Sequence, residues 1–166
     1  MIFQDPYGSL NPKLTVGESV AEGMEVHGLF DSALAIRGEV IRLLDRVGLD
    51  ESAVDRYPIE FSGGQRQRIG IARALAVRPE LIVCDEPVSA LDVSVQAQIL
   101  NLLMDIQDSL GLAVLFISHD LSVVASICDK IIVMNGGAIL ESGTLPEVLG
   151  SPKNEYTRSL LTAAGG

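Results

Sequence analysis

Short apolar runs separated by helix-like segments place the strongest constraint on the fold, and they lie in the residues after Phe61. Each run has the length of a strand, and they are Leu81–Cys84, Ala113–Ile117 and Ile131–Met134. Continuous Val, Ile and Leu runs are typical of strands buried between helices in a parallel sheet. Strands that alternate with helices indicate βαβ units. The sequence therefore predicts an α/β fold with a mostly parallel sheet.

The residues before Phe61 have a different character. Turn formers are dense in Asp5–Pro12, which predicts a loop at the start of the chain. Thr15 and Glu18 then form a capping-box pattern, which predicts a helix that runs to about His27. A second periodic segment predicts a helix from about Ser32 to Val47. We therefore expect a loop followed by a small helical lobe.

Composition excludes some classes of function. A net charge of −10 argues against a general nucleic-acid binder, which would show a basic patch. Cys84 and Cys128 match neither a disulfide framework nor a common zinc spacing, so both are expected to be buried reduced thiols. The apolar runs are far shorter than the roughly 20 residues that span a bilayer. The first residues show no signal-peptide pattern, so we expect any membrane role to act through a partner.

The segment Ser62-Gly63-Gly64-Gln65 is the sharpest local feature. It opens a predicted helix, where backbone N–H groups and the positive end of the helix dipole face outward. Glycine lets an anion approach the backbone closely, so the segment predicts a phosphate site. The alternative is an ordinary serine N-cap with glycines beside it.

Two further features follow predicted strands. Asp85 and Glu86 come directly after the run Leu81–Cys84, at the edge where open α/β sheets bind ligands. Asp85 is suited to hold Mg²⁺ and Glu86 to polarise a water, although both could be solvated loop acids. His119 follows the run Ala113–Ile117 and could contact a phosphate, or it could be a loop histidine beside Asp120, a predicted helix cap. Arg66, Arg68 and Arg73 are interpreted as a solvated, salt-bridged helix face.

Taken in order, these features resemble the ATP-binding cassette (ABC) ATPase family. Its Q-loop, signature motif, Walker B strand with catalytic glutamate, D-loop and switch histidine correspond to Gln4, Ser62–Gln65, Asp85-Glu86, Ser89–Asp92 and His119. The resemblance covers essentially the whole chain. It implies a partial P-loop NTPase (RecA-like) core with a small helical subdomain. On this basis residues 1–78 form the Q-loop and helical subdomain with the signature helix, and residues 79–166 form the C-terminal half of the core.

The resemblance also implies roles for individual residues and the cofactors ATP and Mg²⁺. Asp85 and Gln4 would serve Mg²⁺, Glu86 would act on the attacking water, and His119 and Gln4 would sense the γ-phosphate. Ser62, Gly63, Gly64 and Gln65 would contact ATP held by a second ATPase subunit in a head-to-tail dimer.

In detail, the sequence in and around these motifs is similar to that of the ATPases of oligopeptide, dipeptide and nickel importers. Phe3–Pro12, Asp85–Ser94 and Ser151–Leu161 carry this similarity. It implies an importer subunit on the inner face of the cell membrane, with the Q-loop and helical lobe facing membrane permease subunits. Peptide is the substrate that the family suggests, and a small solute such as nickel is an alternative.

One expected motif does not occur. A phosphate loop of the form G-x-x-x-x-G-K-[ST] grips the β- and γ-phosphates in such ATPases, and no lysine of this sequence follows a suitable glycine. We therefore expect a truncated fragment that binds ATP weakly and hydrolyses it negligibly alone, with an uncovered sheet edge or apolar face. Two alternatives are a non-catalytic partner that lends its signature motif to a composite ATP site, and a non-transport ABC ATPase.

Overall fold

The computed structural model describes residues 1–164, which divide into two compact units. The first unit is Met1–Ile117, and the second begins at Ser118. The first unit holds α1 (Val16–Val26), α2 (Ala33–Arg46), α3 (Gly63–Leu75), β1 (Leu81–Asp85), α4 (Val93–Leu110) and β2 (Ala113–Ile117), together with the 3₁₀ turns Glu51–Ala53 and Pro58–Glu60.

The helical lobe begins where the sequence predicts it. The N–H of Glu18 donates to Oγ1 of Thr15 at 3.2 Å, and the N–H of Thr15 donates to Oε2 of Glu18 at 2.7 Å. This reciprocal capping satisfies donors at the start of α1 that have no partner inside the helix. Val16, Val20 and Met24 form the buried stripe of α1, which packs against α2 and α3. The predicted helical lobe is therefore confirmed.

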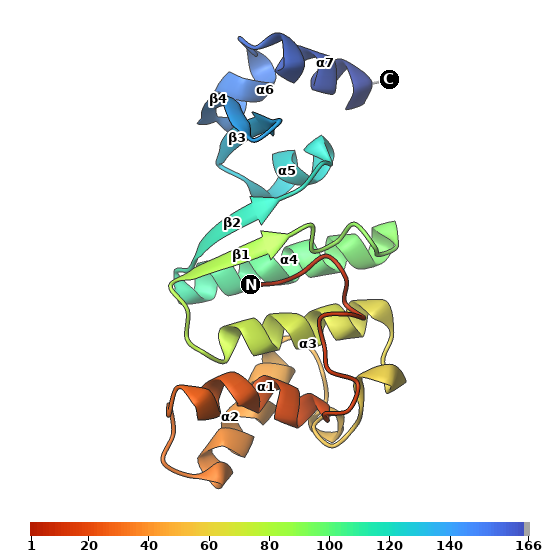
Figure 1. The fold of residues 1–166 in the computed structure, drawn as a ribbon, viewed down its shortest axis with the longest axis vertical. Coiled ribbons are helices and arrows are strands. Elements are labelled where there is room, and N and C mark those ends of the chain that lie inside the picture. Colours follow the sequence, from red (N-terminus) through yellow and green to blue (C-terminus); the bar gives the residue numbers. More distant parts are fainter. Residues whose placement is uncertain (165–166) are drawn as a thin grey trace. The chain divides into compact units, whose positions relative to one another are not determined.

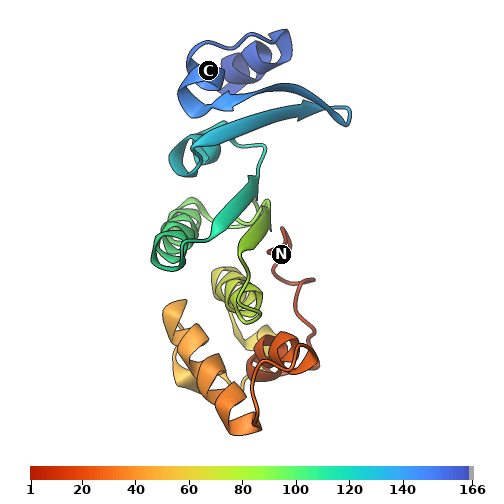
Figure 2. The ribbon, with the colours of Figure 1, turned by 90° about the vertical axis from the view of Figure 1, so that its left-hand side faces the viewer.

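Strands β1 and β2 form the parallel pair of the first unit (Figures 1 and 2). Their register aligns Leu81 with Ala113 and Asp85 with Ile117. A third segment joins them, because Ile2 forms a parallel bridge to Cys84 on β1. The start of the chain is therefore held beside the strand that ends at Asp85.

One face of this sheet is apolar and open to solvent. Ile82 and Cys84 are buried, whereas Leu81 is 53%, Leu115 49% and Ile117 44% exposed. Parallel sheets are normally covered by helices on both faces. The expectation of an uncovered apolar face stays a prediction.

The second unit holds α5 (Leu121–Ile127), β3 (Lys130–Asn135), β4 (Ala138–Thr144), α6 (Leu145–Gly150) and α7 (Glu155–Ala164). Strands β3 and β4 pair antiparallel across a turn at Gly136 and Gly137, whose φ angles are +55° and +81°. This left-handed backbone suits glycine and allows the tight turn between the two strands. A small core of Val124, Ile131, Val133 and Val148 stabilises the unit.

The differences from the predicted elements lie at their ends. The helix expected to end at about His27 is α1 (Val16–Val26), and the helix expected from about Ser32 to Val47 is α2 (Ala33–Arg46). Helix ends fray and depend on caps more than on apolar spacing. The boundary expected at residue 78 separates groups of motifs, whereas the boundary between the two compact units follows Ile117. The domain boundary at residue 78 stays a prediction. Among residues 1–164, no helix combines the length and apolar character that crossing a bilayer requires.

Candidate functional site

The N-terminal segment brings Gln4 to Glu86. The N–H of Ile2 donates to the carbonyl of Val83 at 2.8 Å, and the N–H of Asp85 donates to the carbonyl of Ile2 at 2.9 Å. Two residues further on, Nε2 of Gln4 donates to Oε2 of Glu86 at 2.9 Å. The structure therefore joins two predicted site residues that belong to motifs far apart in the sequence.

The backbone of Glu86 is held in an unusual conformation. Its φ angle is +46°, a left-handed value that is uncommon for a residue with a side chain. Its N–H donates to the carbonyl of Ile117 at 2.9 Å, and its carbonyl accepts a hydrogen bond from Oγ of Ser89 at 3.1 Å. Such local strain persists only where surrounding contacts enforce it, and it is frequent at functional sites. The end of β2 and the D-loop serine fix this conformation.

Asp85 and Gln4 both line an open groove of about 920 Å³. Asp5 and Arg73 also line this groove, as does α1 through Glu22. In the described part of the chain, no group of three or more His, Cys, Asp or Glu side chains is arranged to hold a metal ion by itself.

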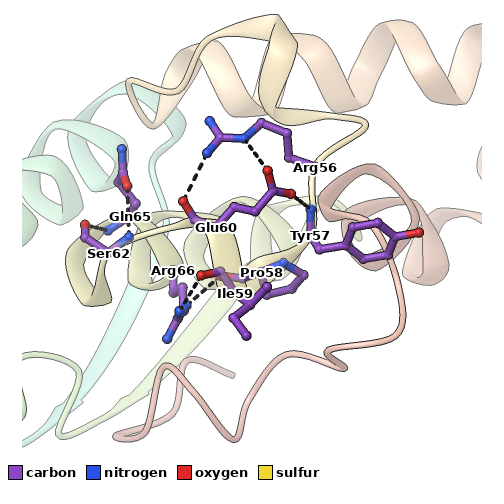
Figure 3. A network of polar contacts seen from close by, with 8 residues as sticks. All are labelled: Arg56, Tyr57, Pro58, Ile59, Glu60, Ser62, Gln65 and Arg66. Carbon is purple, nitrogen blue, oxygen red and sulfur yellow. Dashed lines mark hydrogen bonds and ion pairs between the residues drawn. The ribbon is translucent and has the colours of Figure 1, made fainter.

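The Ser62–Gln65 segment opens α3 as a capping box (Figure 3). The N–H of Gln65 donates to Oγ of Ser62 at 3.3 Å, and the N–H of Ser62 donates to Oε1 of Gln65 at 3.0 Å. The N-cap interpretation is thus confirmed. The helix start still directs the N–H groups of Gly63 and Gly64 away from the helix, as an anion site requires. Anion binding remains a prediction.

Gly64 is required by close packing. A Cβ atom at this position would lie 2.5 Å from Cγ1 of Val95 on α4, far inside van der Waals contact. A Cβ atom at Gly63 would lie 3.4 Å from Cδ2 of Leu91 in the D-loop. The start of α3 therefore lies too close to Val95 for a side chain at Gly64, whereas a Cβ atom at Gly63 would be in ordinary contact with Leu91.

The segment that leads into α3 is held by charged hydrogen bonds (Figure 3). The carboxylate of Glu60 accepts the N–H of Tyr57 at 2.6 Å and Nε–H of Arg56 at 3.3 Å. Both contacts lower the pKa of Glu60, and the hydrogen bond from the N–H of Tyr57 is the larger cause. The guanidinium of Arg56 lies 4.3 Å from the ring centre of Phe61. The backbone that precedes Ser62 is therefore ordered by its own side chains.

The interpretation of the three arginines of α3 as a solvated, salt-bridged face is wrong. Arg66 is buried, Arg68 and Arg73 are half-buried, and none of them forms a salt bridge within residues 1–164. Instead, Arg66 donates to Pro58, Arg68 to Val47 and Arg73 to Ser9, in each case to a backbone carbonyl. The forked guanidinium suits such acceptors, and helical spacing alone does not reveal them.

His119 belongs to the second unit, beside Asp120. The carboxylate of Asp120 accepts the N–H of Ser122 at 2.8 Å and that of Val123 at 3.4 Å, which confirms that it caps α5. The Ser122 hydroxyl is the main cause of the lowered pKa of Asp120, and the neighbouring His119 contributes to it. The role of His119 at a phosphate stays a prediction.

The fold and these contacts define an α/β protein with the motif order of a nucleotide-driven ATPase, and comparison with known proteins places it in a family. Residues 1–89 of the 166 match the family described as ABC transporter. The match takes in more than half of the sequence, and the chain therefore belongs to the ABC transporter family.

Individual relatives are closely similar. The chain is 54% identical over 163 residues to the oligopeptide transport ATP-binding protein OppF of Bacillus subtilis (strain 168), covering 98% of this chain and 53% of the relative. It is 55% identical over 163 residues to the dipeptide transport ATP-binding protein DppF of Lactococcus lactis subsp. cremoris (strain MG1363), covering 98% and 52%. The chain spans about half the length of the curated relatives it matches.

A solved structure has the same fold. The structure of cbiO1 from Clostridium perfringens, part of the ABC transporter complex cbiONQ, superposes with a TM-score of 0.78 at 31% sequence identity. The match covers 90% of this chain and 58% of that one. The α/β architecture predicted from the sequence is therefore that of an ABC ATPase domain.

Proposed function

We propose that the chain is a part of the ATP-binding subunit of an ABC importer, and that its residues act in ATP hydrolysis. The relatives are named as oligopeptide and dipeptide transport ATP-binding proteins, which supports peptides or a similar small solute as cargo. Transport is assigned to the complete complex, since this chain spans about half the length of those relatives.

The observation that carries the proposal is the hydrogen bond of 2.9 Å between Gln4 and Glu86. It joins the glutamine of the predicted Q-loop to the predicted catalytic glutamate, at the carboxyl end of β1. Open α/β sheets bind their ligands at this edge. The hydrogen bond thus brings together two residues that could act on one phosphate group, at the sheet edge where this type of fold binds ligands.

In this proposal Glu86 orients and polarises the water that attacks the γ-phosphate, as a general base does. Gln4 senses the same phosphate, because its amide can exchange the Glu86 carboxylate for a phosphate or water partner. His119 would add a further contact to the γ-phosphate.

The donor set at Asp85 fits Mg²⁺. This ion keeps several waters and is bound in such enzymes through one or two carboxylates together with substrate phosphates, so a single aspartate in a groove that Gln4 also lines is sufficient. When bound, Mg²⁺ would neutralise the negative charge that develops on the transferred phosphate. Asp85 and Gln4 would hold it.

Ser62 to Gln65 would act on ATP bound to a second ATPase subunit in a head-to-tail dimer. The N–H groups of Gly63 and Gly64 and the Ser62 hydroxyl offer donors at the positive end of α3. The capping box fixes the backbone there before the nucleotide arrives, and Gly64 keeps it close to α4. These donors complete a site whose phosphate-gripping loop lies on the other subunit.

The partners and location follow from the importer assignment. The groove lined by Gln4, Asp5 and α1 faces membrane permease subunits in this proposal, so the ATPase would sit at the inner face of the cell membrane. The 166 residues contain no G-x-x-x-x-G-K-[ST] sequence, so this chain does not hydrolyse ATP alone. An intact subunit would supply the phosphate-binding loop in a composite ATP site.

Rescue of a defective ABC subunit tests the proposal. The assay uses a full-length OppF-type subunit whose own signature serine is replaced, so that its ATP sites stay incomplete. The 166-residue chain is then added to this subunit, and ATP hydrolysis is measured. We expect ATP hydrolysis to return with the wild-type chain and to stay absent with Ser62→Ala. Ser32→Ala is the matched control, because Ser32 also caps a helix, accepting the N–H of Ala35 at 3.2 Å on α2. Equal hydrolysis with and without the wild-type chain would contradict the proposal.

A further inference from the structure

The loop that carries Gln4 is fastened to α3 at three places. Arg66 contacts the ring of Tyr7, Nε2 of Gln67 donates to the carbonyl of Phe3 at 3.4 Å, and Nη1 of Arg73 donates to the carbonyl of Ser9 at 2.6 Å. All three side chains belong to the helix that begins immediately after Ser62. The loop and the signature helix are therefore attached to one another along several residues of α3.

Arg66 is the residue among them that also reaches the segment before Ser62 (Figure 3). Its Nε donates to the carbonyl of Pro58 at 2.7 Å, and its Nη2 donates to the carbonyl of Ile59 at 3.2 Å. Two bonds to neighbouring carbonyls fix both the position and the plane of a guanidinium. Arg66 thus connects α3 to the 3₁₀ turn Pro58–Glu60.

The Cζ atom of this guanidinium lies over the ring of Tyr7, 3.9 Å from its centre. Arg66 is 7% exposed, whereas Tyr7 is 66% exposed, so the ring covers a buried cation from the solvent side. The Nη1 group of Arg66 is buried without a hydrogen-bond partner in the described residues. A buried charge without its full set of partners is costly, and the aromatic face supplies part of the compensation.

We propose that Tyr7 and Arg66 are positioning residues that couple the Gln4 loop to the Ser62–Gln65 helix start. The inference rests on the proposed function, since it links the side that senses the γ-phosphate to the side that contacts ATP of the second subunit. Tyr7 lies three residues after Gln4, and Arg66 holds the carbonyls of Pro58 and Ile59, four and three residues before Ser62. A displacement of Gln4 from Glu86 therefore changes the stack and reaches Ser62 through Pro58 and Ile59.

Hydrogen exchange of individual backbone amides in the 166-residue chain tests this coupling. The amides of Ser62 and Gln65 report on the helix start, because each is hydrogen-bonded in the capping box. We expect Tyr7→Ala to raise their exchange rates about fivefold, as the loss of a partly buried cation–π contact predicts. Tyr7→Phe keeps the ring and is expected to restore the wild-type rates. The exposure of Tyr7 leaves little packing to lose in either variant.

A matched control separates coupling from general loosening. Phe30→Ala removes an aromatic ring that lies 5.0 Å from the guanidinium of Arg78, beyond the other end of α3, and leaves the Gln4 loop intact. The buried amides of Ile99 and Leu103 on α4 serve as the internal reference for global opening. Unchanged exchange at Ser62 and Gln65 in Tyr7→Ala would overturn the inference, as would an equal change in Phe30→Ala or in the α4 reference.

The two proposals fail separately. The exchange measurement needs no nucleotide, so it decides the coupling whatever the rescue assay shows. Rescue of hydrolysis by the wild-type chain but also, in full, by Tyr7→Ala would overturn the coupling and leave the proposed function standing. Absence of rescue by the wild-type chain would count against the proposed function alone.

Discussion

The amide of Gln4 donates a hydrogen bond of 2.9 Å to the carboxylate of Glu86, although 82 residues separate them in the chain. The contact depends on the bridge between Ile2 and Cys84, which sets the start of the chain beside β1. It also depends on the left-handed backbone of Glu86, which turns the chain at the end of that strand. The residues proposed as sensor and base are thereby held at one edge of a parallel sheet.

Replacement of Glu86 tests its proposed role as the base. Glu86→Gln keeps the shape of the side chain but cannot take a proton, so in the complete importer subunit we expect hydrolysis to fall about 10²–10⁴-fold. ATP binding should remain. Single-turnover hydrolysis and nucleotide binding measure the two effects, and Glu80→Gln, a carboxyl just before β1, is the control. A near-normal rate in Glu86→Gln would remove Glu86 from the mechanism.

Gly64→Ala tests the close packing of α3 on α4. The new Cβ atom would meet Cγ1 of Val95 at 2.5 Å, so we expect a loss of about 1–3 kcal/mol in the free energy of unfolding measured with urea. Val95→Ala in the same chain should recover part of that loss, because it removes the opposing methyl groups. Gly38→Ala on α2 meets nothing within 4 Å and should be neutral or stabilising. If both glycine variants behaved alike, the packing explanation would be wrong.

The two cysteines should react at different rates. Cys84 is fully buried, and burial raises the pKa of its thiol to about 12, whereas Cys128 is half-buried with a pKa raised by burial and by Asp129. The thiolate is the reactive form, so at about pH 8 a thiol reagent should modify Cys128 first and Cys84 only after unfolding. Mass spectrometry of the labelled chain gives the order. With Cys128→Ser, rapid labelling of the native chain would contradict the buried position of Cys84.

Acid should weaken the segment that leads into Ser62. The pKa of Glu60 is lowered in the folded chain by the N–H of Tyr57 and then by Arg56. The stabilisation is therefore complete above the unfolded pKa of about 4.3, and it is lost as the pH falls through the lower folded value. Urea unfolding at neutral and acid pH should show a smaller pH dependence for Glu60→Gln than for Glu80→Gln. An identical pH dependence in the two variants would exclude Glu60 as a contributor.

The sequence predicted features that short spacing determines. The capping pair Thr15 and Glu18, Ser62 at the start of α3 and Asp120 at the start of α5 each act within a few residues, and all three are confirmed. The order of the motifs along the chain was sufficient to identify the ABC family. Local hydrogen bonding is encoded in the residues themselves, which makes it readable without a structure.

Contacts between distant segments were not predictable in this way. The bond between Gln4 and Glu86 requires the bridge at Ile2, for which a single apolar residue in a loop gives no signal. The burial of Arg66 was missed because helical spacing suggests a charged surface and does not show that Tyr7 and two carbonyls cover it. The sequence signal that pointed to a cover for Arg66 was an aromatic residue, Tyr7, soon after Gln4.

The central claim is that these residues act on ATP whose phosphates are gripped by a loop outside the 166 residues. Titration of Mg-ATP into the isolated chain by calorimetry tests it most directly. We expect no measurable heat of binding, because Asp85, Gln4 and Ser62–Gln65 lack the backbone cradle and lysine that hold the β- and γ-phosphates. Binding in the micromolar range would contradict the claim and would require a second phosphate site within this chain.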